Sequence, residues 1–338
     1  VLDNYQEELK RLQGTIDLVA GGPPCQGFSM AGKRVENDTR NQLVFSYIQF
    51  IKLVKPKMIL FENVKGFTFA FNKKTNKDAI PYSEVVINEL KELGYNVKPH
   101  IIDFSKYGVP QRRKRFILVG IMGGNAENFE TLLEELKTDY LKNKGIESFV
   151  SLQDAISDLF QKNGEIPTPD RKGFNSGVYG DINSNYQRMM RNNIDSKSIP
   201  DSHSFAHHNS FTQKVFTNLI AYYPTKGKRI TNKEREQWHI KKRGLTLLNM
   251  NDVSPTLTSH PDDYVHYAEP RILTVREYAR IQSFPDWYQF KMKYTTGGDM
   301  RKKEVPRYTQ IGNAIPPLFA ELAGRVLIEI LNDGTDAI

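Results

Sequence analysis

The chain has 338 residues, 39% hydrophobic and 25% charged, which is enough for about two folded domains and excludes wholesale disorder. No apolar run approaches the roughly 18 residues of a membrane helix, and the single cysteine, Cys25, excludes a disulfide framework. The 47 basic and 39 acidic residues give a net charge of +8, which fits a polyanionic partner but is shared by many ordinary enzymes. With no secretory signal pattern at its start, we expect a soluble, cytoplasmic protein without membrane contact.

Helix and strand patterns alternate through the first half of the chain. Apolar periodicity predicts helices over residues 5–12, 41–54 and 83–93, and strands over residues 16–20, 58–61, 97–102 and 116–122. Strands alternating with helices of this length indicate βαβ units and a parallel sheet. Such a sheet opens its ligand crevice at the carboxyl ends of its strands, and Cys25 and Glu62 both follow such ends.

The middle of the chain has a different character. Residues 167–250 are polar with little periodicity, and basic clusters occur at residues 226–229 and 241–243. Tyr222 precedes the first cluster and Trp238 the second, and basic residues interleaved with aromatic ones suit nucleic-acid backbone contact and base stacking. A loop-rich surface insert explains the same residues equally well.

Regular patterns return toward the end of the chain. Thr274 and Glu277 have the spacing of a capping box, which predicts a helix that ends before Pro285. A last helix is predicted from Pro317 through Leu331, because proline is tolerated in the first helical turn.

Cys25 is a candidate nucleophile. It lies on a Pro-Pro turn after a predicted strand, where a side chain is displayed and not packed, and cysteine is nucleophilic even when mostly protonated. A lone cysteine is more often a small buried hydrophobe, so both readings stay open at this point. A cysteine-protease dyad would need a distant histidine, and no local signature supports one.

Charged residues accompany this cysteine at neighbouring strand ends. Glu62 follows the next strand and could act as proton donor beside a thiol nucleophile. Arg113 and Arg115 would share one face by strand alternation, and two guanidinium groups suit a phosphate or a carbonyl oxygen. A surface glutamate and a solvated basic edge are the plain alternatives.

Five separated motifs occur in a recognisable order. They are Pro23-Pro-Cys-Gln26, Glu62-Asn-Val64, Gln111-x-Arg-x-Arg115, Arg271-x-Leu-Thr-x-Arg-Glu277 with Gln282-Ser-Phe-Pro-Asp286, and Gly312-Asn-Ala-Ile-Pro-Pro317. Together they resemble the DNA (cytosine-5)-methyltransferases of bacterial restriction–modification systems. The resemblance covers about residues 15–125 and 252–332 and skips the middle, where this family keeps its variable target-recognition segment.

The resemblance implies a Rossmann-like, doubly wound, mostly parallel α/β sheet with a smaller, irregular target-recognition domain. It divides the chain into a catalytic domain at residues 1–160, completed by residues 308–338, and a recognition domain at residues 161–307. It implies methyl transfer from S-adenosylmethionine to carbon 5 of a flipped cytosine in double-stranded DNA. No metal ion is implied, and the functional partner is a cognate restriction enzyme in a bacterial cytoplasm.

The same resemblance assigns roles in the reaction. Cys25 adds to carbon 6 of the cytosine, and Glu62 holds and protonates the N3 side of the ring. Arg115 hydrogen-bonds the cytosine carbonyl, and Arg113 supports the site.

Further contacts are assigned to the cofactor and to DNA. The resemblance implies cofactor contacts at Leu43, Asn313 and Ala314, and DNA contacts at Gln26, Ser29 and Thr256. The basic clusters add DNA contacts at Lys228, Arg229, Lys241 and Lys242.

Two features that the family normally carries are missing from this sequence. They are the Phe-x-Gly-x-Gly turn that cradles the methionine part of the cofactor and the acidic residue that holds its ribose. We expect roughly the first three strands to be absent from this sequence or supplied by a second polypeptide, and S-adenosylmethionine to bind poorly to this chain alone.

Three other interpretations are weighed against this one. A tRNA cytosine would use the same chemistry, and a catalytically silent DNA-binding subunit would explain the missing cofactor half. His203 and His207 have a spacing that could bind a metal on a helix, but the surroundings predict a loop and no third ligand is evident.

Overall fold

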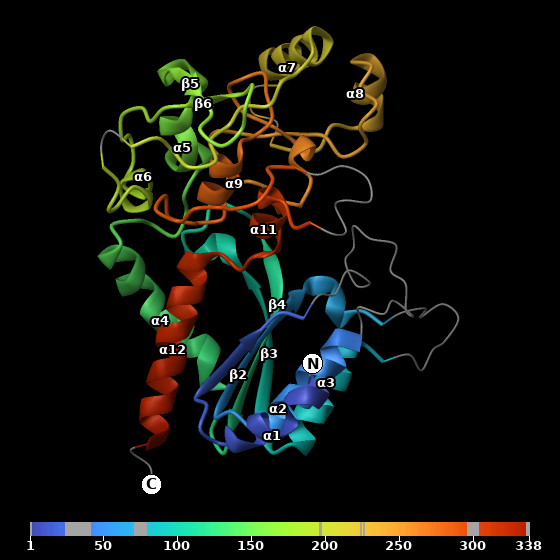
Figure 1. Cartoon of the computed structure of the whole chain (residues 1–338), viewed down its shortest axis with the longest axis vertical. Helices are drawn as coiled ribbons and strands as arrows, with labels where there is room; N and C mark the ends of the chain where they lie inside the picture. Colours follow the sequence, from blue (N-terminus) through green and yellow to red (C-terminus); the bar gives the residue numbers. More distant parts are fainter. Residues whose placement is uncertain are drawn as a thin grey trace. The chain divides into compact units, whose positions relative to one another are not determined.

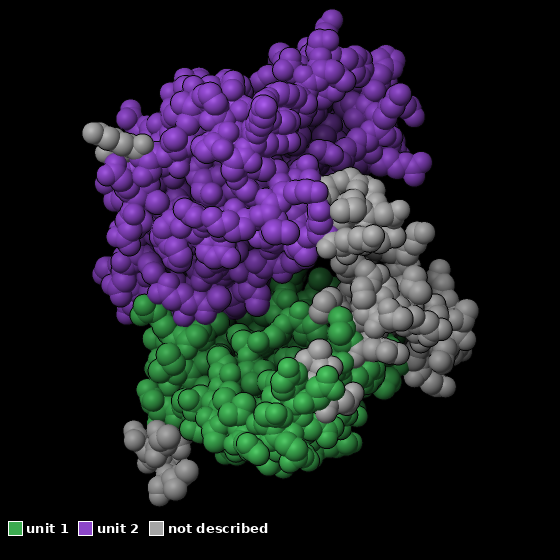
Figure 2. Space-filling model, viewed as in Figure 1, with its two compact units in different colours: residues 1–103, 114–136, 323–338 green, residues 104–113, 137–322 purple. Residues whose placement is uncertain are grey.

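The computed structural model describes residues 2–23, 42–70, 80–195, 198–223, 225, 227–295 and 304–335. The chain divides into two compact units, shown in Figure 2. Unit 1 comprises residues 1–103, 114–136 and 323–338, and unit 2 comprises residues 104–113 and 137–322. The predicted boundary near residue 160 separates a catalytic domain from a recognition domain and does not coincide with this division. The two units are defined by packing alone, so the functional boundary stays a prediction.

Unit 1 is built on a four-stranded sheet in the order β1-β2-β4-β3. Its strands are β1 (Leu18–Gly21), β2 (Met58–Val64), β3 (Tyr95–Asp103) and β4 (Lys114–Met122). Its helices and 3-10 turns are η1 (Leu2–Tyr5), α1 (Gln6–Arg11), α2 (Gln42–Val54), η3 (Lys65–Thr68) and α3 (Tyr82–Glu92). All seven predicted elements of the first half are confirmed, with ends that differ from the prediction by at most three residues.

The strand directions confirm one expectation and correct another. β1 pairs with β2 in parallel, and β4 pairs antiparallel with both β2 and β3. Three of the four strands therefore run in one direction, which confirms a mostly parallel sheet, whereas β4 runs against them. The connection between β3 and β4, residues 104–113, is too short for the crossover helix that a parallel neighbour requires.

Helices cover both faces of this sheet. On one face α2 and α3 lie side by side in Figure 1 and share a buried core with the sheet. That core comprises Val44, Ile48, Ile51, Ile59, Phe61, Phe67, Val86, Leu90, Tyr95, Val97, Phe116 and Leu118. On the other face the ring of His100 lies 5.5 Å from Phe129 in α4 (Asn128–Asn143). Unit 1 is therefore doubly wound, as the α/β class predicts.

Unit 2 consists of short elements joined by long irregular segments. Its strands are β5 (Glu165–Pro167), β6 (Asn175–Gly177), β7 (Thr246–Leu247) and β8 (Tyr264–Val265). Its helices are η4 (Phe104–Tyr107), α5 (Leu152–Ile156), η5 (Ser157–Leu159), η6 (Gln161–Asn163), α6 (Asn185–Met190), α7 (Ser210–Tyr222), α8 (Asn232–Gln237), η7 (Pro261–Asp263), α9 (Val275–Ile281) and α11 (Arg307–Asn313). The helix α12 (Pro317–Thr335) begins in unit 2 and ends in unit 1. None of the helices in the described ranges is long and apolar enough to cross a membrane.

Two predicted helices are confirmed here, and α5, α6, α7, α8 and α11 were not predicted. α9 carries the predicted capping box, in which the Thr274 hydroxyl accepts from the Glu277 N–H and the Glu277 carboxylate accepts from the Thr274 N–H. α12 begins at Pro317, as predicted. α7 contradicts the expectation of little periodicity between residues 167 and 250.

Charged residues of the late motifs lie inside unit 2. Arg280 donates from Nε to Asp286 at 2.6 Å and from Nη2 to Asp158 at 3.1 Å, and all three side chains are fully buried. Arg271 likewise donates to both carboxylate oxygens of Glu277. Because a buried charge is costly unless it is paired, each of these charges depends on its partner inside unit 2.

Candidate functional site

Glu62 and Arg115 form an ion pair at one end of the unit 1 sheet. The β2–β4 register places Val64 opposite Arg115 and Glu62 opposite Ile117. Glu62 and Arg115 are therefore diagonal neighbours, close enough for long side chains to meet. Nε of Arg115 lies 2.9 Å from Oε1 of Glu62, and the two side chains are only 11% and 13% exposed.

The reversed direction of β4 is what creates this pair. Because β4 is antiparallel, its first residues lie at the carboxyl end of β2, where Glu62 is. A parallel β4 would place Arg115 at the opposite edge of the sheet. Arg115, which was predicted to bind the carbonyl of the substrate, therefore lies beside Glu62, the predicted catalytic carboxylate. It does so because β4 runs antiparallel to β2.

The backbone after β1 lies directly against Glu62. A Cβ atom at Gly22 would lie 2.9 Å from Oε2 of Glu62, so only glycine leaves this oxygen undisturbed. Asn63, which is buried, donates a long hydrogen bond of 3.5 Å from Nδ2 to the carbonyl oxygen of Pro23. The strand that carries the carboxylate therefore also holds the backbone that leads toward Cys25. Cys25, Gln26 and Ser29 themselves lie outside the described residues.

Arg113 has different neighbours from Arg115. Its side chain is 1% exposed, and its guanidinium donates to the Gly312 carbonyl oxygen at 2.7 Å and to the Leu257 carbonyl oxygen at 3.4 Å, all within unit 2. The prediction that Arg113 and Arg115 share one face of a strand is wrong. β4 begins at Lys114, so Arg113 precedes the strand. Any part that Arg113 plays in the reaction stays a prediction.

Two buried glutamines join the same segments of unit 2. Gln111 accepts from the Leu257 N–H at 3.0 Å and donates from Nε2 to Oε1 of Gln282. Gln282 in turn donates from Nε2 to the carbonyl oxygen of Ala314. This chain of amides connects residue 257, next to the predicted DNA contact Thr256, with the predicted cofactor contact Ala314. Both glutamines occur in the motifs quoted from the sequence, but no role was predicted for either of them.

The other predicted contacts lie at the surfaces of their own units. The Thr256 side chain is exposed, although its hydroxyl donates to the Arg112 carbonyl oxygen at 2.6 Å. Asn313 is exposed at the end of α11, and Ala314 follows it half-buried. Leu43, in the first turn of α2, is 43% exposed.

The predicted basic contacts separate into exposed and paired residues. Lys228, Arg229 and Lys241 are exposed, whereas Nζ of Lys242 lies 3.0 Å from Asp263. The expected stacking surface stays a prediction: the Tyr222 ring lies 5.8 Å from Trp238, which packs against the core of unit 2, while Tyr222 itself is 64% exposed.

Two buried histidines are fixed in the neutral form. His203 donates from Nε2 to the Leu159 carbonyl oxygen at 2.9 Å, and its Nδ1 lies 2.8 Å from the Thr274 hydroxyl. Burial lowers the pKa of His203 to about 4 and that of His266 to about 3. Both ring nitrogens of His203 are thus occupied by protein groups. The described ranges contain no group of three or more His, Cys, Asp or Glu side chains placed to hold a metal ion.

Comparisons with known proteins agree with this geometry. The family model described as C-5 cytosine-specific DNA methylase matches residues 2–329. The Type II methyltransferase M.DdeI of Desulfomicrobium norvegicum is 31% identical over 356 residues, covering 98% of this chain and 78% of the relative. The Type II methyltransferase M.XorII of Xanthomonas oryzae is 30% identical over 351 residues, covering 98% of this chain and 73% of the relative.

Solved structures share the fold. A prophage-encoded Escherichia coli protein described as a DNA modification methyltransferase superposes with a TM-score of 0.63 at 23% identity, covering 94% of this chain and 80% of that one. The Entamoeba histolytica methyltransferase EhMeth superposes with a TM-score of 0.50 at 13% identity, covering 98% and 80%. At these identities the likeness concerns the fold, and it confirms the predicted fold class.

Proposed function

The chain belongs to the C-5 cytosine-specific DNA methylases, and on that premise we propose that it methylates carbon 5 of a flipped cytosine in a short duplex site, with S-adenosylmethionine as donor. In this role it protects DNA from a cognate restriction enzyme in the bacterial cytoplasm. The observation that carries the proposal is the Glu62–Arg115 pair beside Gly22, because it places a fixed carboxylate next to the backbone that leads to Cys25.

The chemistry requires a nucleophile and a proton donor on one base. Carbon 5 of cytosine is too weak a nucleophile to attack a methyl sulfonium directly. In the proposed reaction Sγ of Cys25 bonds to carbon 6. The electron pair of the carbon 5–carbon 6 double bond moves through the ring to N3, which takes a proton from Glu62. After methylation at carbon 5, the proton there leaves to solvent, the Sγ–carbon 6 bond breaks and N3 returns its proton to Glu62, which restores the aromatic ring, the thiolate and the carboxylic acid.

The arrangement in unit 1 suits these steps. Arg115 holds one oxygen of Glu62, so the carboxyl group keeps its orientation, and the other oxygen lies 2.9 Å from the place that a Cβ atom at Gly22 would take. Cys25 is two residues beyond Pro23, a length of chain that spans at most about 7 Å. A guanidinium group has five N–H donors in a fixed geometry, and that of Arg115 is proposed to bind the cytosine carbonyl as well as Glu62.

The cofactor and the DNA complete the proposed site. S-adenosylmethionine supplies the methyl group, and we assign contacts with it to the exposed side chains of Leu43 and Asn313 and to Ala314. A cytosine inside a duplex cannot reach Cys25, so the base must leave the stack at a cost of a few kcal/mol. Thr256, Gln26 and Ser29 are proposed to contact the DNA around it.

The test is labelled methyl transfer from S-adenosylmethionine to unmethylated plasmid DNA and, in parallel, to tRNA. We expect 5-methylcytosine at one short duplex site and none in tRNA. Cys25→Ser removes the nucleophile and is expected to abolish transfer while duplex binding persists. A duplex with 5-fluorocytosine at the target should give a stable protein–DNA adduct, because the fluorine cannot leave as a proton does.

Other results would replace the proposal. Transfer by Cys25→Ser at the wild-type rate would remove Cys25 from the mechanism. Methylation of tRNA alone would change the substrate, and duplex binding without any transfer would identify a silent DNA-binding subunit.

A further inference from the structure

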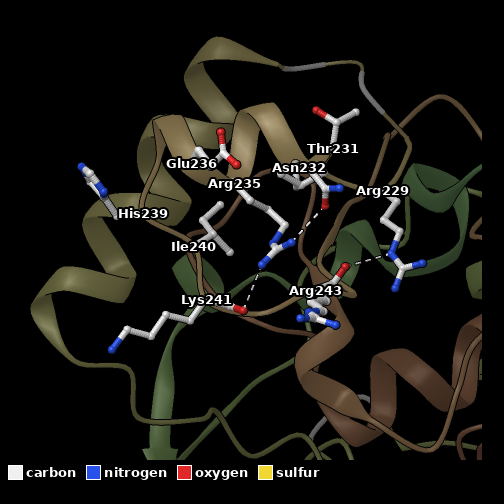
Figure 3. A pocket seen from close by; sticks show the side chains of 10 residues that line it. Arg229, Thr231, Asn232, Arg235, Glu236, His239, Ile240, Lys241 and Arg243 are labelled. Carbon is white, nitrogen blue, oxygen red and sulfur yellow. Dashed lines mark hydrogen bonds between the residues drawn. The ribbon is translucent and has the colours of Figure 1, made fainter.

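An open cavity of about 1020 Å³ lies in unit 2, between α8 and the segment that follows it. We call it the basic cavity, and Figure 3 shows its lining. The lining residues are Arg229, Ile230, Thr231, Asn232, Arg235, Glu236, His239, Ile240, Lys241 and Arg243. Arg229 and Lys241 are predicted DNA contacts, Arg243 belongs to the basic cluster at residues 241–243, and Arg235 lies outside both clusters.

The charge of the basic cavity is strongly one-sided. Four cationic side chains line it (Arg229, Arg235, Lys241 and Arg243) against one carboxylate, that of Glu236. Within the described part of the chain, none of the four cations forms an ion pair. The cavity therefore keeps its positive charge in the folded protein.

Neutral groups hold two of these cations in place. Arg235 donates to Oδ1 of Asn232 at 3.0 Å and to the Lys241 carbonyl oxygen at 3.3 Å, and Arg229 donates to the Arg243 carbonyl oxygen at 3.1 Å. Figure 3 shows these bonds and places Arg235 between α8 and Lys241. Because the acceptors are uncharged, they orient the guanidinium groups without cancelling their charge.

The lining favours phosphate over bases as the ligand. Among the described residues, no phenyl or indole ring lines the basic cavity, and Trp238 packs against the unit 2 core. Stacking of bases needs exposed flat rings, whereas phosphate oxygens need cations and N–H donors. The neighbouring Lys242 differs from Lys241, because it is already paired with Asp263.

We propose that the basic cavity binds the phosphodiester backbone of duplex DNA, with Lys241, Arg243 and Arg229 contacting phosphate oxygens and Arg235 forming its fixed cationic wall. This inference rests on the proposed function, which makes DNA the substrate. It adds a site in the variable middle of the chain that contributes affinity and orientation without reading sequence.

The test measures binding of the full chain to a labelled duplex by fluorescence anisotropy between 50 and 200 mM KCl, without cofactor. Each lost phosphate contact lowers the salt slope of log Kd by about 0.9, which weakens binding about fivefold near 0.15 M salt. Lys241→Ala and Arg243→Ala are expected to show this loss for target and non-target duplexes alike. Lys233→Ala, which removes an exposed lysine on α8 outside the lining, is the matched control and should leave the slope unchanged.

A substitution of opposite sign makes the test sharper. Glu236→Gln removes the single carboxylate of the lining, so DNA affinity should increase for every sequence. A loss of folding cannot produce this gain, and circular dichroism of each variant checks the fold.

Several outcomes would overturn the proposal. Equal slopes for Lys241→Ala, Arg243→Ala and the wild type would show that no phosphate is bound here, and a changed target site would show that the cavity reads bases. Calorimetric titration with pyrophosphate identifies a small soluble ligand instead, if Arg243→Ala abolishes that binding while the DNA slope stays unchanged. All of these readouts concern binding alone, so a failure of methyl transfer would not be mistaken for a failure of this site.

Discussion

Glu62 and Arg115 neutralise each other at the end of β2, whereas the four cations of the basic cavity keep their charge. The first pair is almost buried and is positioned by two hydrogen-bonded strands. The cations of the cavity are exposed or half-buried and are oriented by neutral acceptors. The same residue type, arginine, thus occupies two opposite electrostatic settings in one chain.

The difference follows from what each region is proposed to bind. A carboxyl group that transfers a proton needs a fixed orientation and a nearby charge that responds little to salt. A surface that attracts a polyanion needs uncompensated charge, and its attraction is screened within about 8 Å at physiological ionic strength. We therefore expect turnover at saturating DNA to be insensitive to salt and the affinity for DNA to be steeply dependent on it.

The largest expected effect comes from breaking the neutral pair. Glu62→Gln keeps the size of the side chain but can neither pass a proton to N3 nor supply the countercharge of Arg115. We expect kcat for methyl transfer to fall by about 10²- to 10⁴-fold, the usual contribution of a general acid. Single-turnover transfer at saturating DNA measures it, with duplex affinity as the control. A kcat close to that of the wild type would show that Glu62 is not the proton donor.

A smaller effect, on stability and not on turnover, is expected at the arginine two residues before the pair. Arg113→Met keeps most of the volume but leaves the carbonyl oxygens of Gly312 and Leu257 without their donor, at a cost of about 2–4 kcal/mol of unfolding free energy. Urea unfolding measures this loss. Arg112→Ala is the control, because Arg112 forms an exposed ion pair with Asp252, worth at most about 1 kcal/mol. Equal losses for the two variants would contradict the bridging role of Arg113.

The smallest effect, counted per pH unit, concerns the protons that burial keeps off two histidines. His203 and His266 have pKa values lowered to about 4 and about 3 by burial, against about 6.5 in the unfolded chain. The unfolded state therefore binds more protons below pH 6.5, and stability falls as pH decreases from 6.5 toward 4, by up to about 1.4 kcal/mol per pH unit for each histidine. Urea midpoints between pH 7 and 4 measure the slope.

His203→Gln is the control for this prediction. Glutamine offers a donor and an acceptor, as neutral His203 does, but takes up no proton. The unfolding free energy of the variant should fall less steeply with decreasing pH, by the contribution of one histidine. An unchanged slope would show that His203 does not contribute to the pH dependence.

Much of the fold is predictable because it depends on local patterns. The α2 and α3 helices place apolar residues on one face, and the α9 capping box is visible as Thr274 and Glu277 three residues apart. The α7 helix was missed although its signal is present: Val215 and Leu219 lie four residues apart on a buried face, and Asn209 caps the helix. A polar composition around it obscured a short amphipathic pattern.

The site was predictable in its residues but not in their partners. The residue pattern of β4 indicates a strand but not its direction, and direction decides that Arg115 meets Glu62. Likewise, one basic run contains Lys241, which lines the cavity, and Lys242, which is paired with Asp263. Such differences depend on residues distant in sequence, and local periodicity carries no information about them.

The division of the chain also sets an order in time. Residues 1–103 and 114–136 of unit 1 are synthesised before most of unit 2, but residues 323–338 come after all of it. Those late residues include Val326 and Leu327 of α12, which are buried in the finished protein. At about 5–20 residues per second, ribosomal synthesis separates the early and late parts of unit 1 by roughly 10–40 s. Throughout that interval a nascent chain therefore carries unit 1 without the part of α12 that belongs to it.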